Sequence, residues 1–87
     1  MHMPEVYYTY VLYSIRYDKI YIGYTSDLKR RLLSHNTLAT KGWTIRFRPW
    51  EILFYEEFST KAEAMKREKE LKSARGRLFI KETYLSK

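Results

Sequence analysis

The sequence predicts a small α+β domain in which a three-stranded antiparallel sheet is flanked by helices, in the order β-β-α-β-α-α. Two segments rich in aromatic and β-branched residues, Tyr7–Ser14 and Ile20–Thr25, are separated by a short polar stretch and predict a hairpin. Gly23 in the second strand indicates a close approach of backbone or ligand. A third strand, Trp50–Phe58, is expected between segments with helical patterning. The chain of 87 residues suits one domain, 1–87, with one core.

The first helix is expected directly after the hairpin. Ser26 or Asp27 can cap its N-terminus, and Leu28 and Leu32 form its apolar side. Beyond this helix the periodic pattern breaks down until Pro49, which indicates an irregular connection to the third strand.

The last part of the chain predicts two more helices. Thr60 and Glu63 match the capping box, in which two side chains satisfy each other's unpaired backbone amides. The helix that they begin is expected to run from Lys61 to about Ala74, where Gly76 stops it. A short terminal helix that closes the core is suggested by apolar residues at Leu78, Phe79, Ile80, Tyr84 and Leu85.

Composition limits the partners of the chain. Lys and Arg outnumber Asp and Glu by 17 to 10, and a net charge of +7 favours a polyanion such as nucleic acid or an anionic membrane surface. No apolar run approaches the roughly 20 residues of a membrane span. The N-terminus lacks the layout of a secretory signal, so a cytoplasmic location is expected. The absence of cysteine excludes disulfides and thiolate zinc sites as supports of the fold.

Basic residues are concentrated in the middle of the sequence. Between Asp27 and Glu51 the chain carries no acidic residue, and Trp43, Phe47 and Trp50 are interleaved with the basic ones. Such basic side chains can contact phosphates while aromatic rings stack on unpaired bases. The alternative is a solvated basic face beside core aromatics. The candidate nucleic-acid-binding residues of this stretch are Lys29, Arg30, Lys41, Arg46 and Arg48.

Arg31 and His35 form a candidate catalytic pair on the first helix. They are four residues apart, so they project from one face of it. A guanidinium beside an imidazole suits a phosphate that gains charge during attack. The alternative is an ordinary exposed pair on a basic helix.

Glu68 is the candidate metal ligand. It lies among the apolar positions Ala64, Met65 and Leu71 of the second helix, where a carboxylate is desolvated unless it is paired or binds a metal. Magnesium sites commonly use one or two carboxylates and complete the shell with water and substrate phosphate. The alternative is a glutamate at the edge of the apolar stripe that pairs with a nearby Lys or Arg.

Two triplets in the predicted hairpin resemble the paired signature of the GIY-YIG endonucleases. Tyr21-Ile22-Gly23 matches the second triplet literally, and Tyr8-Thr9-Tyr10 keeps the final tyrosine of the first, eleven residues before Tyr21. The resemblance runs from about Tyr8 to Lys72. It is closest to the small stand-alone bacterial members of the family, which are related to the N-terminal nuclease domain of the bacterial excinuclease.

The resemblance implies metal-dependent hydrolysis of phosphodiester bonds in nucleic acid, with DNA as the expected substrate and repair or recombination as the setting. It places the family's metal-binding glutamate at Glu68, which would hold one Mg²⁺ or Mn²⁺ ion. Arg31 would offset charge on the phosphate oxygens. Tyr10 or Tyr21, which the sequence does not distinguish, would help deprotonate the attacking water. His35 could accept the phenolic proton, and Arg31 together with the metal would favour the phenolate.

The sequence departs from the family pattern in two places. Tyr8 and Thr9 replace the glycine and isoleucine of the first triplet, which we expect to change strand packing more than chemistry. Residues 73–77 lack the asparagine that many members carry beyond the metal-binding glutamate. Two other functions stay open: a catalytically inactive nucleic-acid-binding module of the same fold, and a small adaptor whose basic helices dock an acidic protein. A buried carboxylate argues against the inactive module, because binding alone does not need one.

Overall fold

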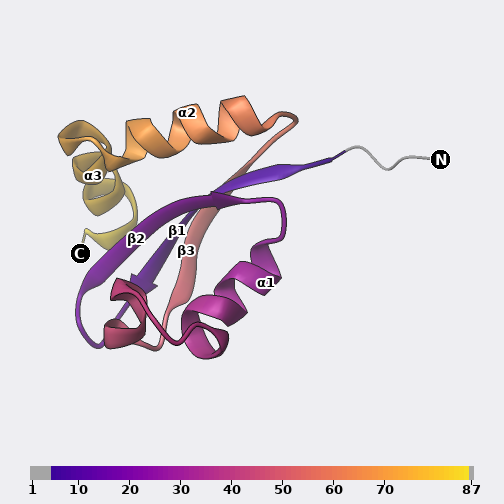
Figure 1. Ribbon diagram of the computed structural model, residues 1–87. Coiled ribbons are helices and arrows are strands. Elements are labelled where there is room, and N and C mark those ends of the chain that lie inside the picture. The colour runs from indigo at the N-terminus through magenta and orange to yellow at the C-terminus, as the bar shows by residue number, and fades with distance from the viewer. Residues whose placement is uncertain (1–4, 87) are drawn as a thin grey trace.

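The computed structural model describes residues 5–86, and its sheet contains three strands. Strand β1 spans Tyr7–Ser14, β2 spans Lys19–Thr25 and β3 spans Glu51–Phe58. β1 lies in the centre and pairs antiparallel with β2 on one side and β3 on the other (Figure 1). The predicted α+β class with a three-stranded antiparallel sheet is confirmed.

Among the described residues, three helical segments lie between β2 and β3, and three more follow β3. Helix α1 begins at the predicted cap, because the Asp27 carboxylate accepts a hydrogen bond from the Arg30 amide at 3.1 Å. The Thr60 hydroxyl accepts from the Glu63 amide at 3.2 Å and starts α2, as the capping box predicts. The helical elements are α1 at Leu28–Leu33, a π-helical turn at Ser34–Leu38, a 3₁₀ turn at Trp43–Phe47, α2 at Lys61–Lys72, α3 at Ala74–Ile80 and a final π-helical turn at Lys81–Leu85.

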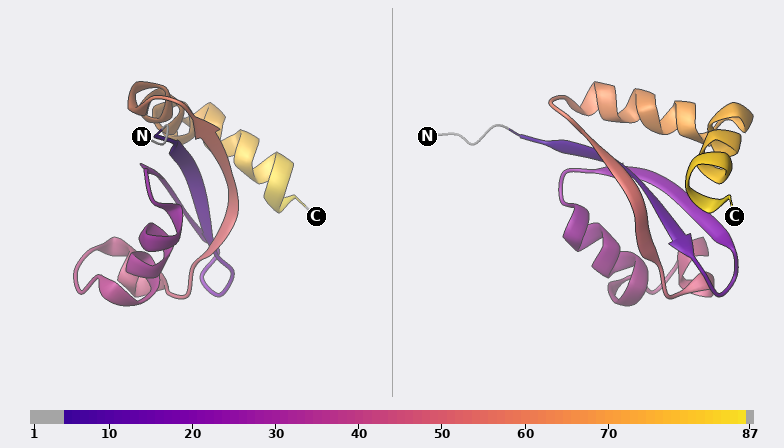
Figure 2. Two further views of the ribbon diagram at one scale, coloured as in Figure 1. Left: turned by 90° about the vertical axis from the view of Figure 1, so that its right-hand side faces the viewer. Right: turned by 180° about the vertical axis from the view of Figure 1, so that it is seen from behind.

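The helices form two layers on opposite faces of the sheet. Figure 2 shows α1 and the turns after it on one side, and α2 and α3 on the other. Two core clusters fill the space beneath these layers, because side chains of a strand alternate between its faces. The cluster under α1 consists of Tyr10, Leu12 and Trp50. The cluster under α2 and α3 consists of Val11, Ile22, Leu71 and Ile80.

The junction between α2 and α3 differs from the prediction. Helix α2 ends at Lys72, and Gly76 lies inside α3 instead of stopping α2. Ser73 caps α3, since its Oγ accepts from the Gly76 amide at 3.1 Å and donates to the Glu70 carbonyl at 2.6 Å. A Cβ at position 76 would overlap the Glu70 carbonyl oxygen, so glycine allows α3 to turn sharply back on α2.

Some apolar residues that we expected in the core are exposed. Met65 is 41% exposed and does not belong to the buried stripe of α2, which consists of Ala64 and Leu71. In α3, Leu78 and Phe79 are exposed, while Ile80 is fully buried and closes the core as predicted.

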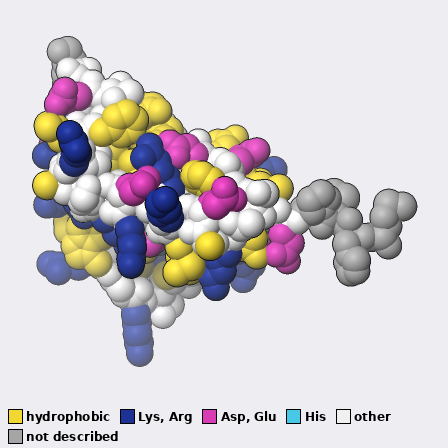
Figure 3. Space-filling model, turned by 90° about the horizontal axis from the view of Figure 1, so that it is seen from above, with side chains coloured by type: hydrophobic (Ala, Val, Ile, Leu, Met, Phe, Trp, Pro, Cys, Tyr) yellow, Lys and Arg dark blue, Asp and Glu magenta, His cyan; other side chains and the backbone are white. Residues whose placement is uncertain are grey.

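The outer surface above α2 mixes charges of both signs. Seen from above, Lys and Arg side chains lie beside Asp and Glu side chains (Figure 3), so the net positive charge of the chain does not form one continuous patch there. Within residues 5–86, none of the helices has the length and apolar character that crossing a bilayer requires.

Candidate active site

A cleft of about 520 Å³ is lined by residues of β1, β2, α1 and α2. Four of the predicted site residues, each from a different element, meet there: Tyr10, Tyr21, Arg31 and Glu68. The rest of its lining is formed by Tyr7, Gly23, Tyr24, Thr25, Ser26 and Lys61. The cleft therefore joins the strand carrying the second triplet to helices on both layers.

Strand register directs both phenols to the same face of the hairpin. Tyr10 lies opposite Gly23, and Leu12 lies opposite Tyr21. Since side chains of directly opposed residues share a face and alternate along the strand, Tyr10 and Tyr21 project to one side. Their ring centroids are 6.3 Å apart. Both phenols therefore lie on the side of the hairpin that lines the cleft.

Gly23 makes room for the ring of Tyr10. A Cβ built at position 23 would lie 2.6 Å from the Tyr10 hydroxyl oxygen and 2.8 Å from its Cζ atom, closer than real Cβ contacts. The ring thus crosses directly over the glycine. Glycine inside a strand often marks such a close approach. The glycine of the second triplet is therefore explained by the space that the Tyr10 ring needs.

His35 stands behind Tyr10 and outside the cleft lining. It lies in the π-helical turn after α1 and is only 8% exposed, so it is not part of an ordinary exposed pair. Its Nε2 atom lies 3.1 Å from the Tyr10 hydroxyl, and its Nδ1 atom lies 3.1 Å from Thr44 Oγ1. Burial lowers the pKa of His35, and Arg31 and Arg48 lower it further, so the imidazole is neutral near pH 7. A neutral imidazole can accept a phenolic proton.

Burial dominates the ionisation of Tyr10. The side chain is 1% exposed, and this desolvation raises the pKa of the phenol far above its ordinary value. The Tyr21 phenol and the Glu68 carboxylate raise it further, whereas Arg31 lowers it. Arg31 thus acts on the pKa of Tyr10 in the expected direction, toward the phenolate, and in the protein alone the effect of burial is larger.

Glu68 combines burial with access to the cleft. Its side chain is 19% exposed, and Ala64 and Leu71, about one helical turn away on either side, are both buried in the core. The Lys72 ammonium lies 3.5 Å from Glu68 Oε2. This carboxylate therefore has the lysine partner of the alternative interpretation, yet it also lines the cleft. Because the lysine of this ion pair is about half exposed, the pair is weak and leaves the carboxylate free to exchange partners.

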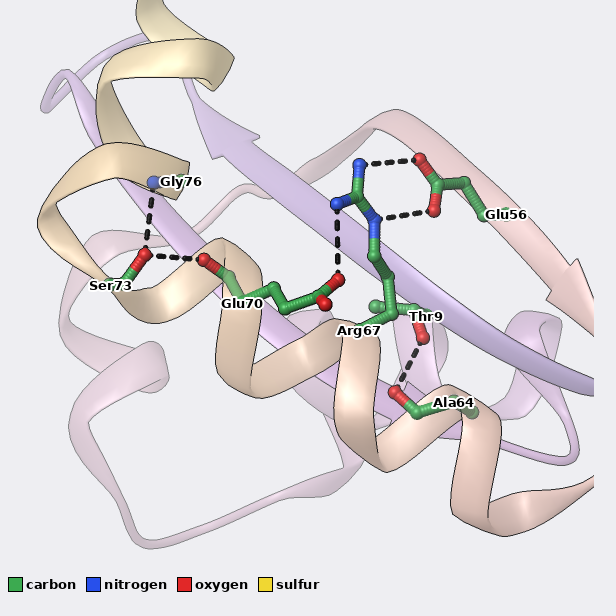
Figure 4. A network of polar contacts seen from close by, with 7 residues as sticks. All are labelled: Thr9, Glu56, Ala64, Arg67, Glu70, Ser73 and Gly76. Carbon is green, nitrogen blue, oxygen red and sulfur yellow. Dashed lines mark hydrogen bonds and ion pairs between the residues drawn. The ribbon is translucent and has the colours of Figure 1, made fainter.

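Contacts on both sides of α2 fix the helix that carries Glu68 (Figure 4). Thr9 of β1 donates a buried hydrogen bond to the Ala64 carbonyl at 2.8 Å. Arg67 forms a two-pronged ion pair with Glu56 of β3, at 2.8 Å and 3.2 Å. Since two strands hold α2, the position of Glu68 relative to the phenols is set by the sheet.

The donors present fit a hydrated ion shared with substrate. Within residues 5–86 there is no group of three or more His, Cys, Asp or Glu side chains that could enclose a metal. Glu68 is a single, largely buried carboxylate that opens onto a cleft with polar walls. Mg²⁺ is commonly held by one or two carboxylates, with water and phosphate oxygens as its other ligands. The donor set thus suits Mg²⁺ or Mn²⁺ in a complex with a phosphodiester.

Four of the five residues predicted to bind nucleic acid are exposed. Lys29 and Arg30 lie on α1 beside Arg31, which is also exposed. Lys41 lies in the connection after α1, and Arg46 lies in the 3₁₀ turn that follows it. These four side chains are available to phosphates.

Arg48 has a structural role, and the prediction that it contacts nucleic acid stays a prediction. Its guanidinium donates to the carbonyl oxygens of His35 at 2.6 Å, Ala39 at 2.7 Å and Ser34 at 3.3 Å. Ser34 and His35 belong to the turn after α1, and Ala39 directly follows it, where the last carbonyls of a helical segment lack partners within the helix. Arg48 therefore stabilises the segment that presents His35 to Tyr10.

Two of the residues near the site that were not predicted contribute polar groups to it from unexpected places. Lys61 lines the cleft at the first position of α2, and Thr44 holds the inner nitrogen of His35. The capping box predicts where α2 begins, but no pattern in the sequence shows that a cleft opens at that point. Thr44 likewise stands in the irregular connection, where periodicity gives no information.

The sheet, the two helical layers and the cleft together define a GIY-YIG type of domain. Residues 6–83 match the family model described as the GIY-YIG catalytic domain, and the chain belongs to this nuclease family. The predicted resemblance to small stand-alone bacterial members is confirmed by its relatives, which are named UPF0213 proteins.

Two relatives and one solved structure illustrate the similarity. The UPF0213 protein YazA of Bacillus subtilis is 43% identical over 70 residues, which cover 77% of this chain and 71% of YazA. A UPF0213 protein of Bacillus pumilus is 38% identical over 71 residues, covering 78% of this chain and 72% of the relative. The solution NMR structure of the UPF0213 protein BH0048 from Bacillus halodurans matches with a TM-score of 0.53 at 28% identity, covering 91% of this chain and 86% of that one.

Proposed function

We propose that this chain is a metal-dependent endonuclease that hydrolyses phosphodiester bonds of nucleic acid, with DNA as substrate in repair or recombination. The observation that carries the proposal is the meeting of Tyr10, Tyr21, Arg31 and Glu68 in one cleft, with His35 bonded to Tyr10. Membership of a nuclease family supports the reaction class. A module that only binds nucleic acid does not need a largely buried carboxylate at this place.

Glu68, through a metal ion, and Arg31 each stabilise part of the negative charge on the scissile phosphate. Glu68 would hold Mg²⁺ or Mn²⁺, and the ion would supply stabilisation of the negative charge that develops on the phosphate. Arg31 is exposed at the cleft and contacts the other phosphate oxygens, where charge develops during attack. Lys29 and Arg30, its neighbours on α1, contact adjacent phosphates and hold the backbone across the cleft.

The two phenols have different surroundings and therefore different roles. Tyr10 is buried, and its hydroxyl is hydrogen-bonded to His35, so it is a positioning residue whose proton can pass to the imidazole. Tyr21 lies in the cleft and is more exposed than Tyr10. A base must lie within hydrogen-bond reach of the proton that it removes, and this favours Tyr21 as the phenol that contacts the attacking water.

A panel of labelled nucleic acids incubated with Mg²⁺ or Mn²⁺ tests the proposal. Cleavage should fall by at least about 10³-fold in Glu68→Ala, because a catalytic ion contributes several kcal/mol to the transition state. Glu70→Ala is the matched control, since it removes a carboxylate of the same helix that pairs with Arg67 instead of lining the cleft. Cleavage by Glu68→Ala at the parent rate would exclude the metal assignment.

The roles of the phenols are tested in the same assay. Tyr21→Phe should lose more activity than Tyr10→Phe, because the first removes the group in contact with water and the second removes a positioning contact. The opposite order would exchange these roles. If the parent protein binds with a steep salt dependence but cuts no substrate with either ion, it is an inactive binding module instead.

A further inference from the structure

Three aromatic rings and three basic side chains form a surface that the proposed reaction does not use. We call it the aromatic-basic patch, and it consists of Tyr17, Trp43, Phe47, Arg16, Lys19 and Arg46. Tyr17 belongs to the turn between β1 and β2, whereas Trp43 and Phe47 belong to the 3₁₀ turn after α1. Trp43 is 46% exposed and Tyr17 is 41% exposed. Two connections that are far apart in the sequence thus build one surface.

The rings of the patch support one another. The centroids of Trp43 and Phe47 lie 4.7 Å apart, and those of Tyr17 and Phe47 lie 5.6 Å apart with edge-to-face geometry. Such contacts hold aromatic side chains in fixed orientations. Trp43 is therefore held in place although nearly half of it is exposed.

The basic side chains lie over the faces of the other two rings. Lys19 Nζ is 5.6 Å and Arg46 Cζ is 5.9 Å from the centroid of Phe47. Arg16 Cζ is 5.5 Å from the centroid of Tyr17. These cation–π contacts keep three positive charges within the aromatic-basic patch. Asp18, in the same turn, accepts a hydrogen bond from Tyr13 at 2.8 Å and offsets part of this charge.

Trp50 is a core tryptophan and provides a comparison for Trp43. It is 3% exposed, and its Nε1 donates to the Thr44 carbonyl at 2.8 Å. Trp43 packs against Trp50, with centroids 5.8 Å apart, yet remains at the surface. Exposed aromatic rings that cluster together mark interaction sites in soluble proteins.

Ring contacts also connect the patch to the cleft. The centroid of Tyr21, in the cleft, lies 6.5 Å from that of Trp50, which in turn contacts Trp43. Successive stacked nucleotides are about 3.4 Å apart along a strand. The two ring distances place the centroid of Trp43 within about four nucleotide steps of that of Tyr21.

We propose that Trp43 is a stacking platform for unpaired bases, so that the substrate carries a single-stranded segment beside the scissile bond. The statement that the single-stranded segment lies beside the scissile bond rests on the proposed function. The stacking of bases on Trp43 does not, because base binding can be measured without cleavage. Stacked base pairs of an intact duplex shield their ring faces, whereas unpaired bases can stack on a protein ring. Lys19 and Arg46 contact the phosphates that flank the stacked base.

Three matched DNAs test the platform in the presence of a metal chelator. The first is a duplex, the second carries a single-stranded tail with the same total number of phosphates, and the third is the tailed DNA with abasic sites in the tail. We expect the tailed DNA to bind about 5- to 150-fold more tightly than the abasic one, the range that stacking of one base gives. Tailed DNA should also quench tryptophan fluorescence, and the abasic DNA should not.

Substitutions separate stacking from charge. Trp43→Ala should remove the preference for tailed DNA and keep the slope of log affinity against log salt, whereas Trp43→Phe should keep much of the preference. Arg46→Gln should instead reduce the salt slope by about one phosphate contact. Phe79→Ala is the matched control, since Phe79 is 41% exposed with Arg67 5.7 Å from its ring, but lies on α3.

The outcomes distinguish the platform from the nuclease proposal. Equal binding of tailed and abasic DNA by the parent, or an unchanged preference in folded Trp43→Ala, would overturn the platform even if Mg²⁺-dependent cleavage is observed. A base-dependent preference without any cleavage would support the platform as a binding surface and contradict the proposed endonuclease. Circular dichroism of each variant verifies that it is folded. If Trp43→Ala does not fold, Trp43→Leu, which keeps apolar bulk without an aromatic face, provides the same comparison.

Discussion

Gly23→Ala is the substitution whose effect follows most directly from the structure. The added methyl group would meet the Tyr10 ring, with its Cβ 2.6 Å from the hydroxyl oxygen and 2.8 Å from Cζ. The ring is 1% exposed, so neighbouring atoms pack against nearly all of it. Either the strand or the ring must move, and movement of the ring breaks its hydrogen bond to His35.

The magnitude can be worked out from these contacts. Overpacking of a core by one methyl group costs about 1–3 kcal/mol, and loss of the Tyr10–His35 hydrogen bond adds about 0.5–1.5 kcal/mol. Alanine offsets about 0.5–1 kcal/mol, because glycine is unfavourable inside a strand. We therefore expect Gly23→Ala to lower the free energy of unfolding by about 1–3 kcal/mol. For a chain of this size that lowers Tm by about 5–20 °C.

A double-mutant cycle with Tyr10→Phe isolates the clash. Unfolding would be followed by circular dichroism in urea and on heating, for the parent, both single variants and the double variant. Tyr10→Phe removes the hydroxyl, which is the closest atom, so Gly23→Ala should cost at least about 0.5 kcal/mol less in that background. The cleavage rate of Gly23→Ala should also fall, because the displaced ring lines the cleft.

One result would refute this reasoning. If Gly23→Ala has the Tm of the parent and the two substitutions add without coupling, the ring does not cross the glycine. The glycine of the second triplet would then need another explanation, such as close approach of the substrate backbone.

Three further predictions concern charge at the site. Arg31→Ala should lower the turnover of DNA by about 10²–10³-fold and change binding by much less, and equal losses would make Arg31 a simple phosphate anchor. Lys72→Gln should lower the Mg²⁺ concentration for half-maximal cleavage by up to about fivefold, since the lysine 3.5 Å from Glu68 no longer competes with the ion; an unchanged titration would contradict this. The lowered pKa of His35 makes the unfolded chain bind a proton that the native state does not, so the free energy of unfolding should fall as pH drops below about 6.5. That pH dependence should be flatter in His35→Gln, measured by urea unfolding between pH 5 and pH 7.5, and identical slopes would exclude His35 as its source.

The sequence predicts the hairpin and both helix starts because these depend on neighbouring residues. Asp27 and Thr60 cap helices through amides three residues away, and the polar turn brings two β-prone segments together. The predicted end of α2 is wrong because glycine usually follows a helix, whereas Gly76 here permits α3 to pack closely against α2. Close packing between two helices depends on the tertiary structure, so a glycine in the sequence does not predict it.

The site was predictable only in part for a similar reason. Helical spacing places Arg31 and His35 on one face, but it does not show that His35 turns inward to Tyr10 while Arg31 stays in the cleft. Resemblance to the family, and not periodicity, indicated that Glu68 joins them. Arg48 could not be assigned from sequence, because its acceptors are backbone carbonyls whose positions depend on how the connection folds.

The central strand limits how the cleft can move. Thr9 bonds to the helix that carries Glu68, and the next residue, Tyr10, packs in the opposite layer. Adjacent residues of one strand therefore fix both walls of the cleft, and the walls cannot move apart or together without distorting the sheet. A bound nucleic acid should therefore leave amide hydrogen exchange in α2 unchanged, and pliable backbones should be cut in preference to stiff ones.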